Sequence, residues 1–303
     1  MTFEVTILGA GSATPTLSSH ASAQAVQVGS DYYLIDCGEG TQYRLLDQKI
    51  RPSRLKGIFI THLHGDHYFG LFGLLTSLSL GSRTEDLLLF GPKGLSEILT
   101  EVFRQSDTRL SYYLDFQEID AGNPGLIYDA PSFSVSTLPL RHRIPCTGFL
   151  FREKIGERNL IKEKLSPDMS HEALRTLKSG KDVSGEAGGI LYSYEEFTTP
   201  PPPPRTYAYC SDTIFRPELV PYLKDVDCLY HEATFREDEL ARANKTHHST
   251  AGQAATLAKE AGVGKLLIGH LSSRYAEVGP SLDEARSIFP DTYLAEEGTT
   301  YSV

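Results

Sequence analysis

The sequence predicts an α/β protein in which helices cover the faces of β-sheets. Short apolar runs rich in β-branched residues alternate with helical patterns through the middle of the chain, and further strand runs lie near both ends. A chain of 303 residues can bury a large core and lies at the upper end for a single domain. We therefore expect one domain over residues 1–303, although the alternation alone does not distinguish one α/β arrangement from another.

The N-terminal part of the chain begins with strands. We expect strands at 3–8, 23–28 and 32–36, the last of which alternates as a half-buried strand does, and a helix at 41–47. The segment Gly9-Ala10-Gly11-Ser12 resembles a dinucleotide-binding fingerprint, but it lacks the third glycine and a following helix. We interpret it as a tight loop, with a structural role and a substrate contact as equal alternatives.

A dense group of metal-binding residue types follows the next strand. Residues 57–60 have the character of a buried strand, and Thr61-His62-Leu63-His64-Gly65-Asp66-His67 comes directly after them. The apolar stretch 68–75 then predicts a helix. The ligand-type residues therefore lie where a strand leaves a sheet.

The spacing of these residues suits two metal ions. Side chains repeat every second residue in an extended segment, so His62 and His64 point to the same side and can share one ion. Gly65 permits a turn, from which Asp66 and His67 project in a new direction and can serve a second ion. Imidazole with carboxylate suits Zn²⁺ best, with Mn²⁺ or Fe as substitutes. The alternative is a polar loop whose histidines cap a helix and face water.

The alternation continues to the C-terminal part of the chain. Strands are expected at 87–90, 112–117, 132–139, 147–151, 206–210, 226–230 and 266–268, and helices at 93–105 and 251–261. Pro92 is interpreted as the start of the first of these helices, and Ser249 or Thr250 as the cap of the second. Asp36, which closes the strand 32–36, is interpreted as a residue that orients a metal ligand.

The segment 152–197 interrupts this alternation. Eight Lys and Arg residues lie within it, and we interpret its balance as mildly positive in a chain whose net charge is −10. A short helix is expected near 171–177, and Pro200 to Pro204 form a stiff hinge that returns the chain to the core. The alternative to a binding role is a solvated surface excursion.

Composition limits the class of protein. The net charge of −10 argues at first against a nucleic-acid partner, which usually binds Lys and Arg. No run of eighteen apolar residues predicts a membrane span, and Met1 to Thr6 carry no secretion signal. The four scattered cysteines fit buried thiols in a reducing cytoplasm, either as packing residues or with one that senses oxidation.

Several motifs together carry a resemblance to a known family. The H-L-H-G-D-H residues at 62–67 resemble the signature of the metallo-β-lactamase superfamily. Further segments narrow the resemblance to ribonuclease Z, the 3′ tRNA processing endonucleases, and these segments lie at 9–16, 36–42, 211–213, 231–235, 248–250 and 269–275. The first motif marks only the superfamily, whereas the H-E-A-T-F and H-S-T pair is much more specific.

The resemblance implies a fold and a set of metal ligands. The fold is the four-layer αβ/βα sandwich of the superfamily, with the site at one edge between two facing sheets. It implies two Zn²⁺ per subunit, the first held by His62, His64 and His142, the second by Asp66, His67 and His270, with Asp212 between them. Without this resemblance, His142 between two arginines would be interpreted as a surface residue, and Asp212 as a turn former or a helix cap.

The resemblance also implies catalytic roles. Asp66 takes a proton from the attacking water, and His248, paired with Glu232, protonates the departing 3′ oxygen. The products are a 3′-hydroxyl on the tRNA and a 5′-phosphate on the trailer. Arg274 is expected to contact the substrate.

For the segment 152–197 the resemblance implies a flexible arm that grips the body of a precursor tRNA. Lys154, Arg158, Lys162 and Lys164 are the expected contacts. The family usually works as a homodimer, and we expect a cytoplasmic protein with no membrane partner.

The sequence leaves two other classes of function open. One is a hydrolase of small phosphodiesters, sulfate esters or lactams that uses the same metal core. Another is a non-enzymatic RNA-binding protein with a vestigial site.

Overall fold

The computed structural model describes residues 2–14, 16, 19–185 and 188–303. Within these residues the chain divides into two compact units. The large unit comprises Met1–Asp129, Val135–Phe151 and Arg205–Val303, and the small unit comprises Ala130–Ser134 and Arg152–Pro204.

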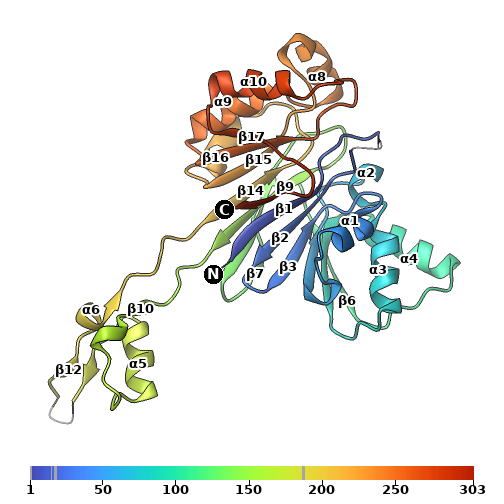
Figure 1. Cartoon of the computed structure of the whole chain (residues 1–303). Helices are drawn as coiled ribbons and strands as arrows, with labels where there is room; N and C mark the ends of the chain where they lie inside the picture. Colours follow the sequence, from blue (N-terminus) through green and yellow to red (C-terminus); the bar gives the residue numbers. More distant parts are fainter. Residues whose placement is uncertain (1, 15, 17–18, 186–187) are drawn as a thin grey trace. The chain divides into compact units, whose positions relative to one another are not determined.

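The first sheet of the large unit has the strand order β18-β1-β2-β3-β4-β5-β6 (Figure 1). Its strands are β1 (Phe3–Gly9), β2 (Ala23–Val28), β3 (Asp31–Ile35), β4 (Leu55–Phe59), β5 (Leu87–Pro92), β6 (Leu114–Ile119) and β18 (Thr300–Ser302). The strands from β18 to β3 pair antiparallel, and those from β3 to β6 pair parallel. The carboxyl ends of β4, β5 and β6 therefore meet at one edge of this sheet, where ligand sites of α/β proteins form.

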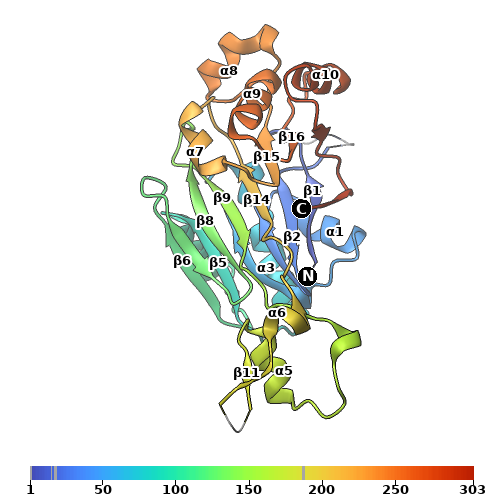
Figure 2. The ribbon, with the colours of Figure 1, turned by 90° about the vertical axis from the view of Figure 1, so that its left-hand side faces the viewer.

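The second sheet has the order β17-β16-β15-β14-β9-β8-β7. Its strands are β7 (Leu126–Asp129), β8 (Phe133–Pro139), β9 (Thr147–Glu153), β14 (Thr206–Cys210), β15 (Cys228–Glu232), β16 (Lys265–Gly269) and β17 (Thr292–Leu294). The strands β14 to β17 pair parallel. Figure 2 shows β8, β9 and β14 of this sheet side by side.

Helices lie outside both sheets (Figure 1). Those of the large unit are α1 (Thr41–Asp47), η1 (Pro52–Arg54), α2 (Gly65–Tyr68), α3 (Leu71–Leu80), α4 (Leu95–Gln105), η3 (Pro217–Leu219), α7 (Val220–Leu223), η4 (Glu237–Glu239), α8 (Leu240–Thr246), α9 (Ala251–Ala261) and α10 (Gly279–Ile288). Leu75 of α3 and Leu95 of α4 are fully buried in the core of the first sheet, and Ala254 and Ala258 of α9 in that of the second. Each sheet thus has one face covered by helices.

The other faces of the two sheets meet through aromatic side chains. Phe59 of β4 stacks on Phe90 of β5 with ring centroids 4.8 Å apart, and its ring lies 5.4 Å from both Phe149 and Phe151 of β9. Phe59, Phe149 and Phe151 are almost fully buried, so their burial contributes to stability on the order of 2 kcal/mol each. The layers therefore run helix, sheet, sheet, helix, which confirms the predicted four-layer αβ/βα sandwich.

Helix α9 begins and ends where its sequence predicts. The Thr250 side chain accepts a hydrogen bond from the backbone N–H of Gln253, whose side chain accepts one from the backbone N–H of Thr250, which completes a capping box. Gly262 ends the helix in a left-handed conformation at φ 67°. The predicted cap is therefore Thr250, while the Ser249 hydroxyl donates to the carbonyl of Thr213.

Two of the predicted element boundaries are wrong. Pro92 lies at the end of β5, in register with Ile119 of β6, and α4 starts only at Leu95 after Gly94 in a left-handed conformation. The apolar stretch 68–75 does not form one helix, because α2 ends at Tyr68 and α3 begins at Leu71. At Gly70 between them, a Cβ would lie 2.0 Å from the carbonyl oxygen of Gly38, so this close approach requires glycine.

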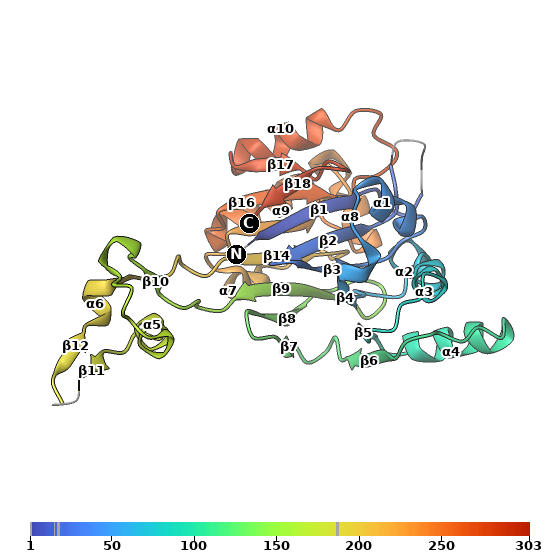
Figure 3. The same cartoon turned by 60° about the horizontal axis from the view of Figure 1, so that its bottom comes forward.

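The small unit contains short elements only. They are β10 (Asn159–Leu160), η2 (Lys162–Lys164), α5 (His171–Lys178), β11 (Val183–Ser184), β12 (Ile190–Tyr192), α6 (Tyr194–Phe197) and β13 (Thr198–Thr199). β10 pairs with β13, and β11 pairs with β12, both antiparallel. Figure 3 shows β11 and β12 next to each other. The predicted helix near 171–177 is confirmed, and Leu177 is its fully buried residue.

The predicted positive balance of the segment 152–197 is wrong. Nine Asp and Glu residues outnumber the eight Lys and Arg residues over this range. An excess of basic residues is confined to 152–181, where eight basic side chains stand against five acidic ones. The basic character therefore belongs to the first two thirds of the segment.

Candidate metal centre

The predicted metal ligands come from loops that follow strands of both sheets. His62 and His64 follow β4 of the first sheet, whereas His142, Asp212 and His270 follow β8, β14 and β16 of the second. Asp66 and His67 lie in the short helix α2. The two facing sheets therefore deliver these side chains to one place from distant parts of the sequence.

A first group consists of His62, His64, His142 and Asp212. His64 Nδ1 lies 3.0 Å from His62 Nε2 and 3.2 Å from His142 Nε2. Asp212 Oδ2 lies 3.7 Å from the Nε2 atoms of both His62 and His142. These four ligand atoms therefore surround one small volume.

A second group consists of Asp66, His67 and His270. Asp66 Oδ2 lies 3.4 Å from His67 Nε2 and 3.6 Å from His270 Nε2. The other carboxylate oxygen of Asp212, Oδ1, lies 3.5 Å from His67 Nε2 and 3.3 Å from His270 Nε2. Asp212 therefore faces each group with a different oxygen, which is the geometry of a bridging carboxylate.

The buried atoms of this centre fit a bound metal. His67 Nε2, His270 Nε2 and Asp212 Oδ1 are buried and lack a hydrogen-bond partner among the described residues. Such atoms are costly when they stay unpaired, and a divalent cation would satisfy all three. Burial alone would raise the pKa of Asp212, but the charges of His270 and His67 outweigh it and lower that pKa, so the carboxylate stays ionised.

The carboxylate of Asp36 holds two of the imidazoles from behind. His67 donates a hydrogen bond from Nδ1 to Asp36 Oδ2 over 2.8 Å, and the Tyr209 hydroxyl donates to the same oxygen. Asp36 Oδ1 accepts from the Thr61 hydroxyl, whose own oxygen lies 2.9 Å from His62 Nδ1. With each Nδ1 engaged in this way, Nε2 of His62 and His67 is turned to the centre, the arrangement that fixes metal-binding imidazoles.

A second network joins the H-E-A-T-F and H-S-T motifs. Glu232 Oε1 lies 2.8 Å from His248 Nδ1, and its Oε2 accepts a hydrogen bond from the Thr234 hydroxyl over 2.7 Å. The same hydroxyl oxygen lies 2.9 Å from Nδ1 of His270. Thr234 therefore links the pair of His248 and Glu232 to a member of the second group.

Burial and charge act in opposite directions on His248. Burial lowers the pKa of its imidazole, but the charge of Glu232 and its hydrogen bond outweigh burial and raise that pKa to about 9. One of its ring nitrogens lies within 4.8 Å of ligand atoms of Asp212 and His270. His248 thus lies at the border of the centre, with Glu232 favouring the protonated form of its imidazole.

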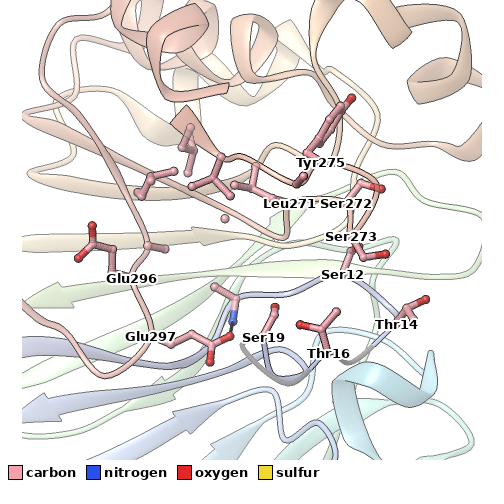
Figure 4. A pocket seen from close by; sticks show the side chains of 17 residues that line it. Ser12, Thr14, Thr16, Ser19, Leu271, Ser272, Ser273, Tyr275, Glu296 and Glu297 are labelled. Atoms are coloured by element: carbon pink, nitrogen blue, oxygen red, sulfur yellow. Dashed lines mark hydrogen bonds between the residues drawn. The ribbon is translucent and has the colours of Figure 1, made fainter. Parts of the chain in front are cut away.

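The loop after β1 supports the second group. The backbone N–H of His270 donates to the carbonyl of Ala10 over 2.7 Å, and His270 itself has the left-handed φ of 57°. Glu297, labelled in Figure 4, accepts a hydrogen bond from the backbone N–H of Ala10 over 3.2 Å, and its carboxylate also pairs with His20 at 2.5 Å. These contacts give the loop a structural role, which is one of the two predicted alternatives. Ser12 also lines the cleft of the centre.

The centre opens into a cleft of about 410 Å³. Asp66, Asp212, His248 and His270 line it, and so do three exposed arginines, which are Arg143, Arg242 and Arg274. Although the net charge of the chain is negative, three cationic side chains thus lie together at the cleft. Sequence reasoning named Arg274 but missed the other two. Arg143 could have been found as the neighbour of His142, whereas nothing in the sequence around Arg242 gave a signal.

The other predicted substrate contacts belong to the small unit. Arg158 donates to the Thr198 hydroxyl over 2.6 Å and its guanidinium lies 4.9 Å from the centre of the Tyr194 ring, while Lys164 donates to the carbonyl of Glu196. These two side chains therefore hold their own unit together. Lys154 and Lys162 are exposed.

Two further predictions concern the cysteines and membrane-spanning segments. Cys37, Cys146, Cys210 and Cys228 are free and buried. Within the described part of the chain, none of the helices combines the length and the apolar character needed to cross a lipid bilayer.

Comparisons with known proteins agree with the motifs. The family model of the Anti-Pycsar protein Apyc1 matches residues 3–173. The Ribonuclease Z of Bacteroides fragilis is 46% identical over 302 residues, which is 99% of each chain, and that of Cytophaga hutchinsonii is 46% identical over 100% of this chain and 97% of the relative.

Solved structures show the same architecture. Human tRNase Z, short form, superposes with a TM-score of 0.72 at 27% identity over 99% of each chain. The metallo-β-lactamase fold protein YhfI of Bacillus subtilis superposes with a TM-score of 0.73 at 18% identity over 100% of each chain, a likeness of fold alone. From the motifs, the fold and the identity over the whole length taken together, this chain belongs to the ribonuclease Z family.

Proposed function

We propose that this protein is a metal-dependent endoribonuclease that removes the 3′ trailer from tRNA precursors. The observation that carries the proposal is the pair of ligand groups that share Asp212 in an open cleft. Relatives that match the whole chain and are named Ribonuclease Z support the same reaction.

The ligand set supports two Zn²⁺ ions per chain, with Mn²⁺ or Fe as substitutes. His62, His64 and His142 would hold the first ion and Asp66, His67 and His270 the second, with Asp212 shared. A structural zinc is usually closed by four ligands of its own, often cysteines, whereas here seven protein ligands would serve two ions, which leaves coordination positions for substrate. When bound, such cations lower the pKa of water and neutralise charge on phosphoryl oxygens.

The protein side chains supply the proton transfers. Burial alone would raise the pKa of Asp66, but the neighbouring imidazoles of His270 and His67 outweigh it and lower that pKa, so the carboxylate is ionised and accepts a proton from the attacking water. His248 donates its proton to the departing 3′ oxygen, and Glu232 holds the ring and compensates its charge.

The direction of attack determines the ends of the products. Water adds to phosphorus as the bond between phosphorus and the 3′ oxygen breaks, and the electron pair of that bond leaves on the oxygen. The tRNA keeps a 3′-hydroxyl and the trailer a 5′-phosphate. The 2′-hydroxyl of the RNA takes no part as nucleophile.

Binding of the precursor is divided between two places. Arg143, Arg242 and Arg274 line the cleft and suit the phosphates next to the cut. We assign a grip on the tRNA body to the arm, residues 152–197, with Lys154 and Lys162 as its exposed cations and Arg158 and Lys164 as further contacts. We also propose that the protein acts as a homodimer and that it works in the cytoplasm. The four free thiols support the second of these proposals, because thiols persist in a reducing compartment.

The test is cleavage of a precursor tRNA that carries a 3′ trailer, with and without a chelator. We expect one cut at the 3′ end of the tRNA, a trailer with a 5′-phosphate, and loss of cleavage on chelation with recovery on addition of Zn²⁺. Turnover of bis(p-nitrophenyl) phosphate without RNA cleavage would favour a hydrolase of small phosphodiesters instead. Binding of the precursor without any turnover would favour a vestigial site.

A further inference from the structure

A second cavity of about 730 Å³ lies beside the metal centre in the large unit. It lies at the carboxyl ends of the parallel strands β5 and β6 and behind the loop that follows β4. Its wall is apolar and is formed by Leu63, Pro92, Ile119, Ala121, Ile144 and Pro145. A volume of this size is within the range of cavities that bind small organic groups, roughly 300–1,000 Å³.

The cavity and the cleft of the metal centre share one lining side chain. His64 lines both the cavity and the cleft, and its Nδ1 belongs to the first group of ligand atoms. A substrate group in the cavity would therefore be separated from the first group only by this imidazole ring.

The polar rim of the cavity suits a base better than a phosphate. Glu118 and Asp120 line it with carboxylates, which repel phosphate but accept hydrogen bonds from the amino groups of bases. Lys93 is the cation of the rim, and within the described residues its ammonium makes no hydrogen bond or ion pair. Apolar walls with polar groups at the edge are how proteins hold a base that is turned out of its stack.

We propose that this cavity, lined by Leu63, Ala121 and Ile144, binds the base of the nucleotide next to the scissile phosphate. The inference rests on the proposed function and adds a specificity site to it. The carboxylates of Glu118 and Asp120 favour a base with an exocyclic amino group over uracil. Lys93 attracts the phosphate that flanks this nucleotide.

The test combines a cavity-filling variant with abasic RNA. We expect Ala121→Phe to lower kcat/KM on intact precursor about tenfold, because the larger side chain fills the apolar volume that the base would occupy. Removing the base on one side of the cut should lower kcat/KM of the unsubstituted protein by a similar factor. On that abasic RNA the variant should cause no further loss, because both changes remove the same interaction. Val102→Phe, on the exposed face of α4, is the control and should act equally on all RNAs.

A second variant keeps the inference testable if Ala121→Phe does not fold. Glu118→Gln should reduce the preference for cytosine over uracil at the same nucleotide, whereas Glu260→Gln, an exposed residue of α9, should leave it unchanged. A protein that cuts intact and both abasic precursors equally well would overturn the inference about the cavity alone. A protein that cuts none of them would overturn the proposed function.

Discussion

The metal centre of the large unit and the small unit hold their ionisable side chains in opposite ways. At the metal centre these side chains are mostly buried, and residues far apart in the sequence hold them: His142 Nδ1 lies 2.9 Å from the carbonyl of His247, 105 positions later. In the small unit they are exposed and paired with neighbours in the same unit, as in the ion pair of Lys178 with Glu157 at 2.6 Å. The first arrangement preorganises groups for chemistry, while the second suits adaptable contacts with a polyanion.

This difference predicts how much each unit loses on substitution. Removal of a buried group leaves its buried partners without a hydrogen bond or a compensating charge. When an exposed lysine is removed, water and salt ions solvate its former partners. We therefore expect effects that decrease from the metal centre, through its supporting network, to the small unit.

The largest effect is expected for Asp212→Ala. Because each oxygen of Asp212 faces a different ligand group, the variant should lose about a thousandfold in kcat/KM, or about 4 kcal/mol. The rise in Tm on addition of Zn²⁺ should shrink with it. Calorimetry and cleavage assays measure both quantities. Asp291→Ala, at an exposed position, should change neither, and an Asp212→Ala protein with unchanged metal content would contradict the bridging role.

The next effect concerns His248→Gln. Loss of a general acid costs roughly 10²–10⁴-fold with RNA, whose 3′ oxygen needs a proton to leave. The loss should be much smaller with bis(p-nitrophenyl) phosphate, because nitrophenolate leaves without protonation. Glu232→Gln should show the same split between the two substrates. Equal losses on RNA and on the activated ester would assign His248 to metal binding instead.

A smaller effect is expected for Thr234→Val. Thr234 acts as a positioning residue, since its oxygen lies between Glu232 and His270, and removal of such a hydrogen bond costs roughly 10–100-fold in metal affinity or activity. Thr234→Ser keeps the hydroxyl and should retain most of the affinity. Competition with a chelator for the bound metal separates the two variants. Equal metal affinities of the Thr234→Val and Thr234→Ser variants would show that the hydroxyl does not orient His270.

The smallest effect is expected in the small unit. The double variant Lys162→Ala, Lys181→Ala should weaken precursor binding several-fold and reduce the salt slope of log K by about one for each phosphate that is no longer neutralised. The rate of cutting bound RNA should change less than the affinity. The pair Lys224→Ala, Lys259→Ala in the large unit is the matched control. An equal decrease of affinity in both double variants would show that the arm does not bind the precursor separately.

The sequence alone could predict the parts of the centre that depend on local spacing. The period of an extended segment placed His62 and His64 on one side, and their ring nitrogens lie 3.0 Å apart. The remaining ligands, such as Asp212 and His270, were identified by resemblance, because residues 150 positions away carry no local signal of their neighbours. Arg242 was missed for the same reason, since its place in the cleft depends on how α8 packs.

The wrong predictions also have physical causes. Pro92 suits a helix start, but a proline can equally end a strand, and pairing with β6 decides between the two. The stretch 68–75 is apolar throughout, and its division into two helices falls where Gly70 closely approaches Gly38. Tertiary contacts, which no local pattern contains, determined the structure in both cases.

The central claim is that two cations share Asp212 in this centre. The most direct measurement is anomalous scattering at the zinc absorption edge from crystals of the Zn²⁺-loaded protein. We predict two peaks, one bounded by His62, His64 and His142 and the other by Asp66, His67 and His270, with the carboxylate of Asp212 in contact with both. A single peak, or a peak away from Asp212, would contradict the account.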